Sequence, residues 1–88
     1  MAFEVRVKKQ ALKKLPKLPS LVQEKFAFLT RDLKEKGPVQ AAWPNYSKLG
    51  KDQYHCHLNY SYVACWTYQK ETITIEVYYV GSRQSAPY

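Results

Sequence analysis

The C-terminal half of the chain carries three β-type segments separated by very short turns, and this feature constrains the fold most. The segments span residues 53–58, 62–69 and 72–80, with Asn59-Tyr60-Ser61 and Lys70-Glu71 between them. Parallel strands need a crossover of a dozen or more residues, whereas connections this short join neighbouring antiparallel strands. The sequence therefore predicts an antiparallel meander.

Alternation within the last segment predicts which side chains share a face, because successive strand residues point to opposite faces. One face is expected to carry Ile73, Ile75, Val77 and Tyr79, and the other Thr74, Glu76 and Tyr78. Gly81 is expected to let the residues after it swing away from the sheet as an extended polar tail.

The N-terminal part predicts one strand and two helices. Residues 2–8 alternate apolar and polar, as a half-buried strand does. Residues 9–15 form a short basic helix that Pro16 is expected to end. A longer helix begins near residue 20, where Ser20 and Gln23 have the spacing of a capping box. Its apolar stripe consists of Val22, Phe26, Leu29 and Leu33, and Gly37-Pro38 is expected to end it.

The predicted order is β-α-α-β-β-β, in a single α+β domain covering residues 1–88, with a further short strand near residues 46–49 in the long connection. The two N-terminal helices are expected to pack on one face of a mostly antiparallel sheet. That arrangement leaves the other face uncovered and able to bind a ligand.

Composition indicates a soluble, folded protein. Apolar residues are 45% and aromatic residues 15% of the 88, unlike the composition of a disordered chain. No run approaches the ~20 apolar residues of a membrane span, and residues 1–7 do not resemble a secretory signal. With only two cysteines, Cys56 and Cys65, we expect a cytoplasmic protein with reduced thiols and no membrane partner.

The positive charge is concentrated near the N-terminus. The net charge is +7, and residues 1–36 hold ten Lys and Arg against four Asp and Glu. A cluster of one sign attracts polyanions, which favours a nucleic-acid contact, although a solvated lysine face would look the same. The candidate phosphate contacts in this stretch are Lys8, Lys9, Lys13 and Lys14.

His55 and His57 are the most informative pair. Strand alternation puts both on one face, while Tyr54, Cys56 and Leu58 face the core. Cleavage of RNA needs a base for the 2′-OH, an acid for the departing oxygen, and cations for the transition state. Two imidazoles that titrate near neutral pH suit this chemistry, although surface histidines with no such role remain an alternative.

Two other interpretations of this segment depend on strand register. If residue 58 pairs with residue 62, then His55 faces Cys65, and the two histidines with Cys65 offer three ligands for zinc. A slip of one residue would instead pair Cys56 with Cys65. No fourth ligand is evident, so we expect no metal site and no other cofactor.

Arg83 and Tyr88 are the candidate residues of the tail. Arginine offers a planar set of donors that matches phosphate, and tyrosine can stack on a base of single-stranded RNA. A frayed terminus without function is the alternative.

These features together resemble the RelE/ParE toxin superfamily, and within it the RelE-like (HigB-like) mRNA interferases of bacterial toxin–antitoxin systems. The similarity covers nearly the whole chain. Its most specific parts are "YHCHLNYSYVACW" (residues 54–66) and "IEVYYVGSRQSAPY" (residues 75–88).

The resemblance implies a toxin that cuts mRNA in the ribosome by metal-independent attack of the 2′-OH. It implies that His55, His57 and Arg83 stabilise charge or carry protons, and that Tyr88 stacks on a base or takes part in proton transfer. Lys48 and Lys51 become candidate phosphate contacts, and the ribosome, mRNA and a cognate antitoxin become the expected partners.

The chain departs from the family pattern in two ways. Histidines stand where the family has basic residues on the strand, and an expected arginine is missing near Tyr62–Val63. The departures leave two alternatives: a ParE-like, non-catalytic inhibitor of DNA gyrase, and a plain RNA-binding module.

Overall fold

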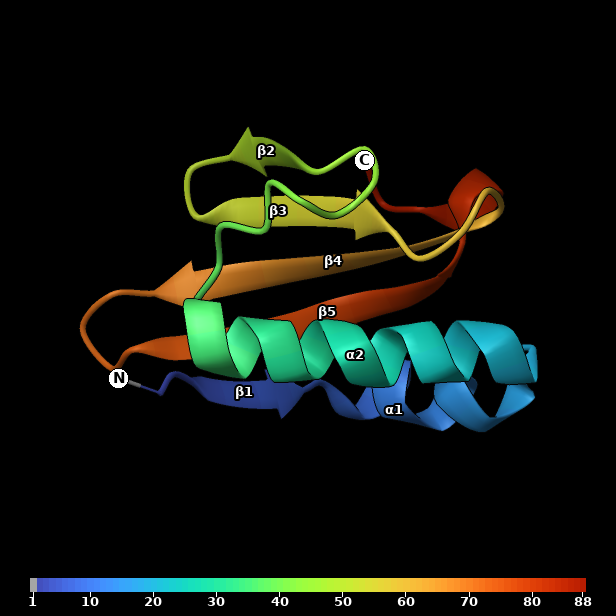
Figure 1. The fold of residues 1–88 in the computed structure, drawn as a ribbon, viewed down its shortest axis with the longest axis horizontal. Coiled ribbons are helices and arrows are strands. Elements are labelled where there is room, and N and C mark those ends of the chain that lie inside the picture. The colour runs from blue at the N-terminus through green and yellow to red at the C-terminus, as the bar shows by residue number, and fades with distance from the viewer. Residues whose placement is uncertain (1) are drawn as a thin grey trace.

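The computed structural model describes residues 2–88 and places all five strands in one sheet with the order β1-β5-β4-β3-β2 (Figure 1). The strands and helices are β1 (Glu4–Val7), α1 (Lys9–Lys14), α2 (Ser20–Lys36), β2 (Ser47–Gly50), β3 (Gln53–His57), β4 (Tyr62–Gln69) and β5 (Thr74–Ser82). Short 3₁₀ turns span Leu15–Lys17 and Arg83–Ser85. β1 pairs with β5 in parallel, and every other neighbouring pair is antiparallel. The predicted α+β architecture is confirmed.

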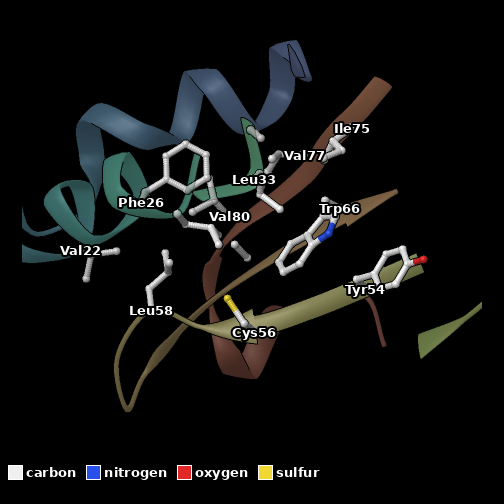
Figure 2. Packing of buried hydrophobic residues seen from close by; sticks show 13 residues of the cluster. Val22, Phe26, Leu33, Tyr54, Cys56, Leu58, Trp66, Ile75, Val77 and Val80 are labelled. Carbon is white, nitrogen blue, oxygen red and sulfur yellow. The ribbon is translucent and has the colours of Figure 1, made fainter. Parts of the chain in front are cut away.

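The hydrophobic core lies between α2 and one face of the sheet. The predicted stripe of α2 is buried, and it meets side chains of β3, β4 and β5 that point toward it (Figure 2). Trp66 lies at the centre with no exposed surface. Its indole Nε1 donates to the Pro38 carbonyl at 3.0 Å, which ties the segment after α2 to the sheet.

Two details of the predicted helices are wrong. Pro16 does not end a helix over residues 9–15, because α1 stops at Lys14 and Pro16 sits inside the 3₁₀ turn that follows. There is also no capping box: Pro19 is the N-cap of α2, and no side chain caps it. The Gln23 amide instead donates to the Leu18 carbonyl at 2.8 Å, so it fastens the connector between the helices.

Gly37 ends α2 with a backbone that other residues adopt at a cost. Its φ is +94°, and its N–H donates to the Leu33 carbonyl at 2.9 Å. A Cβ at this position would lie 2.7 Å from Cζ of Phe3.

Replacing Gly37 by alanine is therefore expected to lower the free energy of unfolding by about 1–3 kcal/mol, from backbone strain and the clash with Phe3. Gly50→Ala is the control, because a Cβ there meets only the Gln53 side chain at 3.8 Å. Urea denaturation of both variants measures the difference, and equal stability of the two would contradict this account of Gly37.

A β-bulge in β5 changes the predicted faces of the last strand. Cys65 pairs with Tyr79 and Trp66 pairs with Val77, so Tyr78 is an extra residue. A bulge reverses the alternation beyond it, and Val80, rather than Tyr79, joins Val77 in the core. The prediction that Tyr79 shares a face with Ile75 and Val77 is wrong, and Ile73 lies outside β5 in the turn and is exposed.

The second face of the sheet is not left uncovered, because the tail folds back over it. Strand pairing continues through Gly81 to Ser82, so Gly81 does not release the chain as expected. After the 3₁₀ turn the chain returns toward β2 and β3, where the C-terminus lies in Figure 1. Pro87 borders two cavities on this face, one with Lys14 and Tyr79 and one with Lys8 and Thr67. We call this surface the tail face.

Neither helix within residues 2–88 has the length and apolar character needed to cross a membrane.

Candidate active site

His55 and His57 lie on the tail face, as the alternation of β3 predicts. Tyr54, Cys56 and Leu58 belong to the core on the opposite side. His55 pairs with Cys65, and His57 pairs with Val63. The short turn sets this register, since the Leu58 N–H donates to the Tyr62 carbonyl at 2.8 Å.

The two imidazoles are neighbours in a largely buried setting. Their ring centroids are 5.9 Å apart, and the side chains of His55 and His57 are only 7% and 9% exposed. The Ser47 hydroxyl hydrogen-bonds Nδ1 of His55 at 3.0 Å. Such a bond fixes the orientation of the ring.

Burial keeps both histidines neutral, and nearby positive charge adds to this effect at His57. Desolvation lowers the pKa of His55 below its ordinary value of 6.5, and a hydrogen bond with Ser47 partly opposes this. Desolvation also lowers the pKa of His57, and repulsion from His55 and Arg83 adds to the effect. At neutral pH both rings are therefore free to accept a proton.

Tyr88 brings the end of the chain onto the histidines. Its ring lies 4.5 Å from the His55 ring, at 49°, and the side chain is 54% exposed. Burial and the neighbouring Cys65 raise the pKa of the Tyr88 phenol, while Arg83 lowers it. The phenol stays protonated at neutral pH and can donate a hydrogen bond.

Arg83 is held beside this group by the β3–β4 turn. Its backbone N–H donates to the Ser61 carbonyl at 2.8 Å, and its guanidinium lies 5.1 Å from the centre of the Tyr60 ring. It influences the pKa of both His57 and Tyr88. The structure therefore brings the four candidate groups from β3 and the tail together on one face. We call His55, His57, Arg83 and Tyr88 the four-residue site.

The predicted lysines divide between the two faces. Lys8 and Lys14 border the tail face, with the Lys14 ammonium 5.4 Å from the centre of the Tyr79 ring. Lys48 pairs with Tyr54 and its ammonium lies 5.8 Å from that ring, which places it on the opposite, helix-covered face. The remaining three, Lys9, Lys13 and Lys51, are exposed.

Cys65 is a neighbour of the site that the sequence suggested as a zinc ligand or as a cross-strand partner of Cys56. The register does place it opposite His55, but no group of three His, Cys, Asp or Glu within residues 2–88 is arranged to hold a metal ion. Burial raises the pKa of both Cys56 and Cys65 to about 12. Both thiols are free.

We therefore expect neither thiol to react with an alkylating or disulfide reagent at pH 8 while the protein is folded, since the thiolate is the reactive form. Thiol titration before and after denaturation checks this. Reaction of Cys65 in the native protein would show that the tail face opens around this residue.

Three residues that lie near the site were not identified from the sequence. Ser47 orients His55 from the edge strand, and Tyr78 lines the tail face beside Pro87. Tyr60 lies against Arg83. The aromatic residue in a short turn was a visible signal for Tyr60, whereas the contact of Ser47 depends on how β2 pairs with β3.

Comparison with known proteins rests on structure, because no protein-family model and no curated protein sequence matches the chain. The archaeal RelE–RelB complex from Pyrococcus horikoshii contains a chain with a TM-score of 0.77 and 19% identity, covering 98% of this chain and 100% of that one. A mutant of the E. coli toxin RelE in the free state has a TM-score of 0.75 and 26% identity, and the match covers 97% of this chain and 88% of that one. A chain of the YoeB–YefM complex from Staphylococcus aureus has a TM-score of 0.72 and 12% identity, and the match covers 94% of this chain and 99% of that one. With its helices, sheet and length all matched, the chain has the fold of the RelE and YoeB toxins.

Proposed function

We propose that the protein is the toxin of a type II toxin–antitoxin system and acts as an endoribonuclease on ribosome-bound mRNA in the cytoplasm. The observation that carries the proposal is the four-residue site, which combines two neutral bases, a cation and a phenol. RelE–RelB and YoeB–YefM structures among the similar proteins support a toxin with an antitoxin partner. The antitoxin would bind the basic surface and cover the site or displace Tyr88.

The proposed reaction is an in-line displacement within the RNA. A neutral imidazole accepts the proton of the 2′-OH, and the 2′-oxygen forms a bond to phosphorus as the bond to the 5′-oxygen breaks. Arg83 stabilises the extra negative charge on the phosphoryl oxygens, and the Tyr88 phenol donates toward the departing oxygen or stacks on a base. The products are a 2′,3′-cyclic phosphate and a 5′-hydroxyl.

The phosphate backbone on either side needs further cations. Lys8 and Lys14 border the tail face and are the nearest candidates. Lys9 and Lys13 on α1 and Lys51 between β2 and β3 are exposed and are further candidates. Lys48 would contact RNA only if the strand wrapped around the edge at β2. Val63, opposite His57, lies where the family resemblance places an arginine, so Arg83 carries a larger share of the charge here.

Acidification is expected to reduce cleavage. The pKa of each histidine lies below 6.5 in the folded protein, so activity should stay level above that value and fall as pH drops below it. Stability changes in the same direction, because the unfolded chain binds these protons more readily than the folded one. Single-turnover cleavage from pH 5 to 8, with circular dichroism to confirm folding at each pH, measures the effect. A flat profile would exclude the histidines from proton transfer.

Expression in bacteria followed by primer extension on cellular mRNA tests the proposed function. Codon-aligned cuts that disappear in Arg83→Ala would support it. A DNA-damage response without RNA cuts would instead identify a ParE-like gyrase inhibitor. If neither effect is seen, a plain RNA-binding module is the remaining alternative.

A further inference from the structure

A polar cavity beside Arg83, at the β3–β4 turn, has no role in the proposed chemistry. It measures about 260 Å³, and its lining consists of Tyr60, Ser61, Tyr62, Ser82, Arg83 and Gln84. Tyr60 forms one wall and is 81% exposed, the largest exposure among the exposed large apolar residues of the chain that the structure describes.

Local hydrogen bonds hold the turn that carries Tyr60. The Asn59 side-chain oxygen accepts from the backbone N–H groups of Ser61 and Tyr62, at 2.8 and 3.0 Å. The Arg83 N–H donates to the Ser61 carbonyl at 2.8 Å, which joins the turn to the tail. The ring of Tyr60 is thus presented in a defined position even though most of its surface is in solvent.

The guanidinium of Arg83 occupies only one side of this ring. It lies 5.1 Å from the ring centre, a distance typical of a cation–π contact. Within residues 2–88, Arg83 has no carboxylate within ion-pair distance. The cation is therefore free to meet a phosphate, and the exposed part of the ring is free to meet a flat group.

We propose that Tyr60 is the stacking platform for the base of a nucleotide flanking the scissile phosphate, with that nucleotide's sugar in the adjoining cavity. The inference rests on the proposed function and names how single-stranded RNA is held at the same site. Arg83 is shared between the cavity and the four-residue site, so a strand whose phosphate contacts Arg83 brings its next base to Tyr60.

The cavity wall suits a ribose. Ser61 and Tyr62, which both carry a hydroxyl group, line it, and Ser82 Oγ already accepts from the Gln84 and Ser85 N–H groups at 3.1 and 3.3 Å. The Ser82 O–H therefore remains available as a donor to a ribose oxygen. Guanidinium, phenol ring and base would form a three-layer stack, an arrangement that single-stranded RNA allows because its bases are unpaired.

The test compares Tyr60→Ala, Tyr60→Phe and the control Phe28→Ala, which removes an exposed aromatic residue from α2. Single-turnover cleavage of ribosome-bound mRNA gives a maximal rate and a half-saturating protein concentration for each. Loss of one stacked base is expected to raise the half-saturating concentration roughly 5- to 100-fold in Tyr60→Ala and to change the preferred base at one position of the cut site. Tyr60→Phe and Phe28→Ala should match the wild type. Wild-type values for Tyr60→Ala, or an equal loss in Tyr60→Phe, would overturn the inference.

A second measurement separates this inference from the proposed function. Fluorescence anisotropy with a labelled 2′-O-methyl RNA hexamer reports binding without cleavage. If the wild type cuts no RNA, the proposed function fails, yet weaker hexamer binding by Tyr60→Ala than by Tyr60→Phe would still support the stacking platform. Equal binding by the two variants, or no binding by the wild type, would reject it.

Discussion

Arg83→Ala is expected to slow mRNA cleavage by about 10²- to 10³-fold, the usual cost of losing one preorganised donor to a charged transition state. Arg83 is the cation that acts on both His57 and Tyr88, and Val63 provides no second charge in its neighbourhood. Because the side chain is exposed, the free energy of unfolding should change by no more than about 0.5 kcal/mol. Single-turnover cleavage and urea denaturation measure the two effects separately.

Two variants control for charge and position. Arg83→Lys keeps the charge but loses the planar donor set, so an intermediate rate is expected. Arg31→Ala removes an exposed arginine from α2, on the other side of the sheet, and should cleave at the wild-type rate. Cleavage by Arg83→Ala as fast as by Arg31→Ala would remove Arg83 from the site.

Trp66→Ala is expected to have the largest effect on stability, lowering the free energy of unfolding by about 3–5 kcal/mol. Trp66 has no exposed surface and stacks with Tyr54 and Tyr46, at centroid distances of 6.2 and 6.4 Å. A small domain has a total stability of about 5–15 kcal/mol, so this loss would leave a marginal protein.

Trp66→Phe separates packing from hydrogen bonding. It keeps most of the ring but leaves the Pro38 carbonyl without its donor, so a smaller loss of about 1–3 kcal/mol is expected. Urea midpoints for the two variants give the comparison. A Trp66→Ala protein as stable as the wild type would mean that the core does not depend on this aromatic stack.

The helices and the meander were predictable because their signals are local. The stripe of α2 and the positive φ of Gly37 lie within one stretch of sequence, and two short turns leave no freedom in how β3, β4 and β5 pair. His55 and His57 were predictable on one face because side chains alternate along β3 and the apolar Tyr54 and Cys56 face the core.

The features that the sequence did not predict depend on contacts between distant segments. The bulge at Tyr78 shifts the register between β4 and β5, which stay paired on both sides of it. No sequence pattern near Tyr78 predicts this bulge. The tail returns over the sheet through packing of Pro87 and Tyr88 on residues from β3 to β5. Lys48 lies on the face of Tyr54 because of how β2 pairs with β3, and this pairing is irregular. The four residues of this edge strand do not predict the pairing register.

The chemical nature of the RNA ends tests the central claim most directly. Purified protein is incubated with mRNA on programmed ribosomes, and the fragments are analysed for their termini. The four-residue site predicts a 5′-hydroxyl on one fragment and a 2′,3′-cyclic phosphate on the other, because the 2′-oxygen is the nucleophile. Intact mRNA, or fragments that begin with a 5′-phosphate, would contradict it.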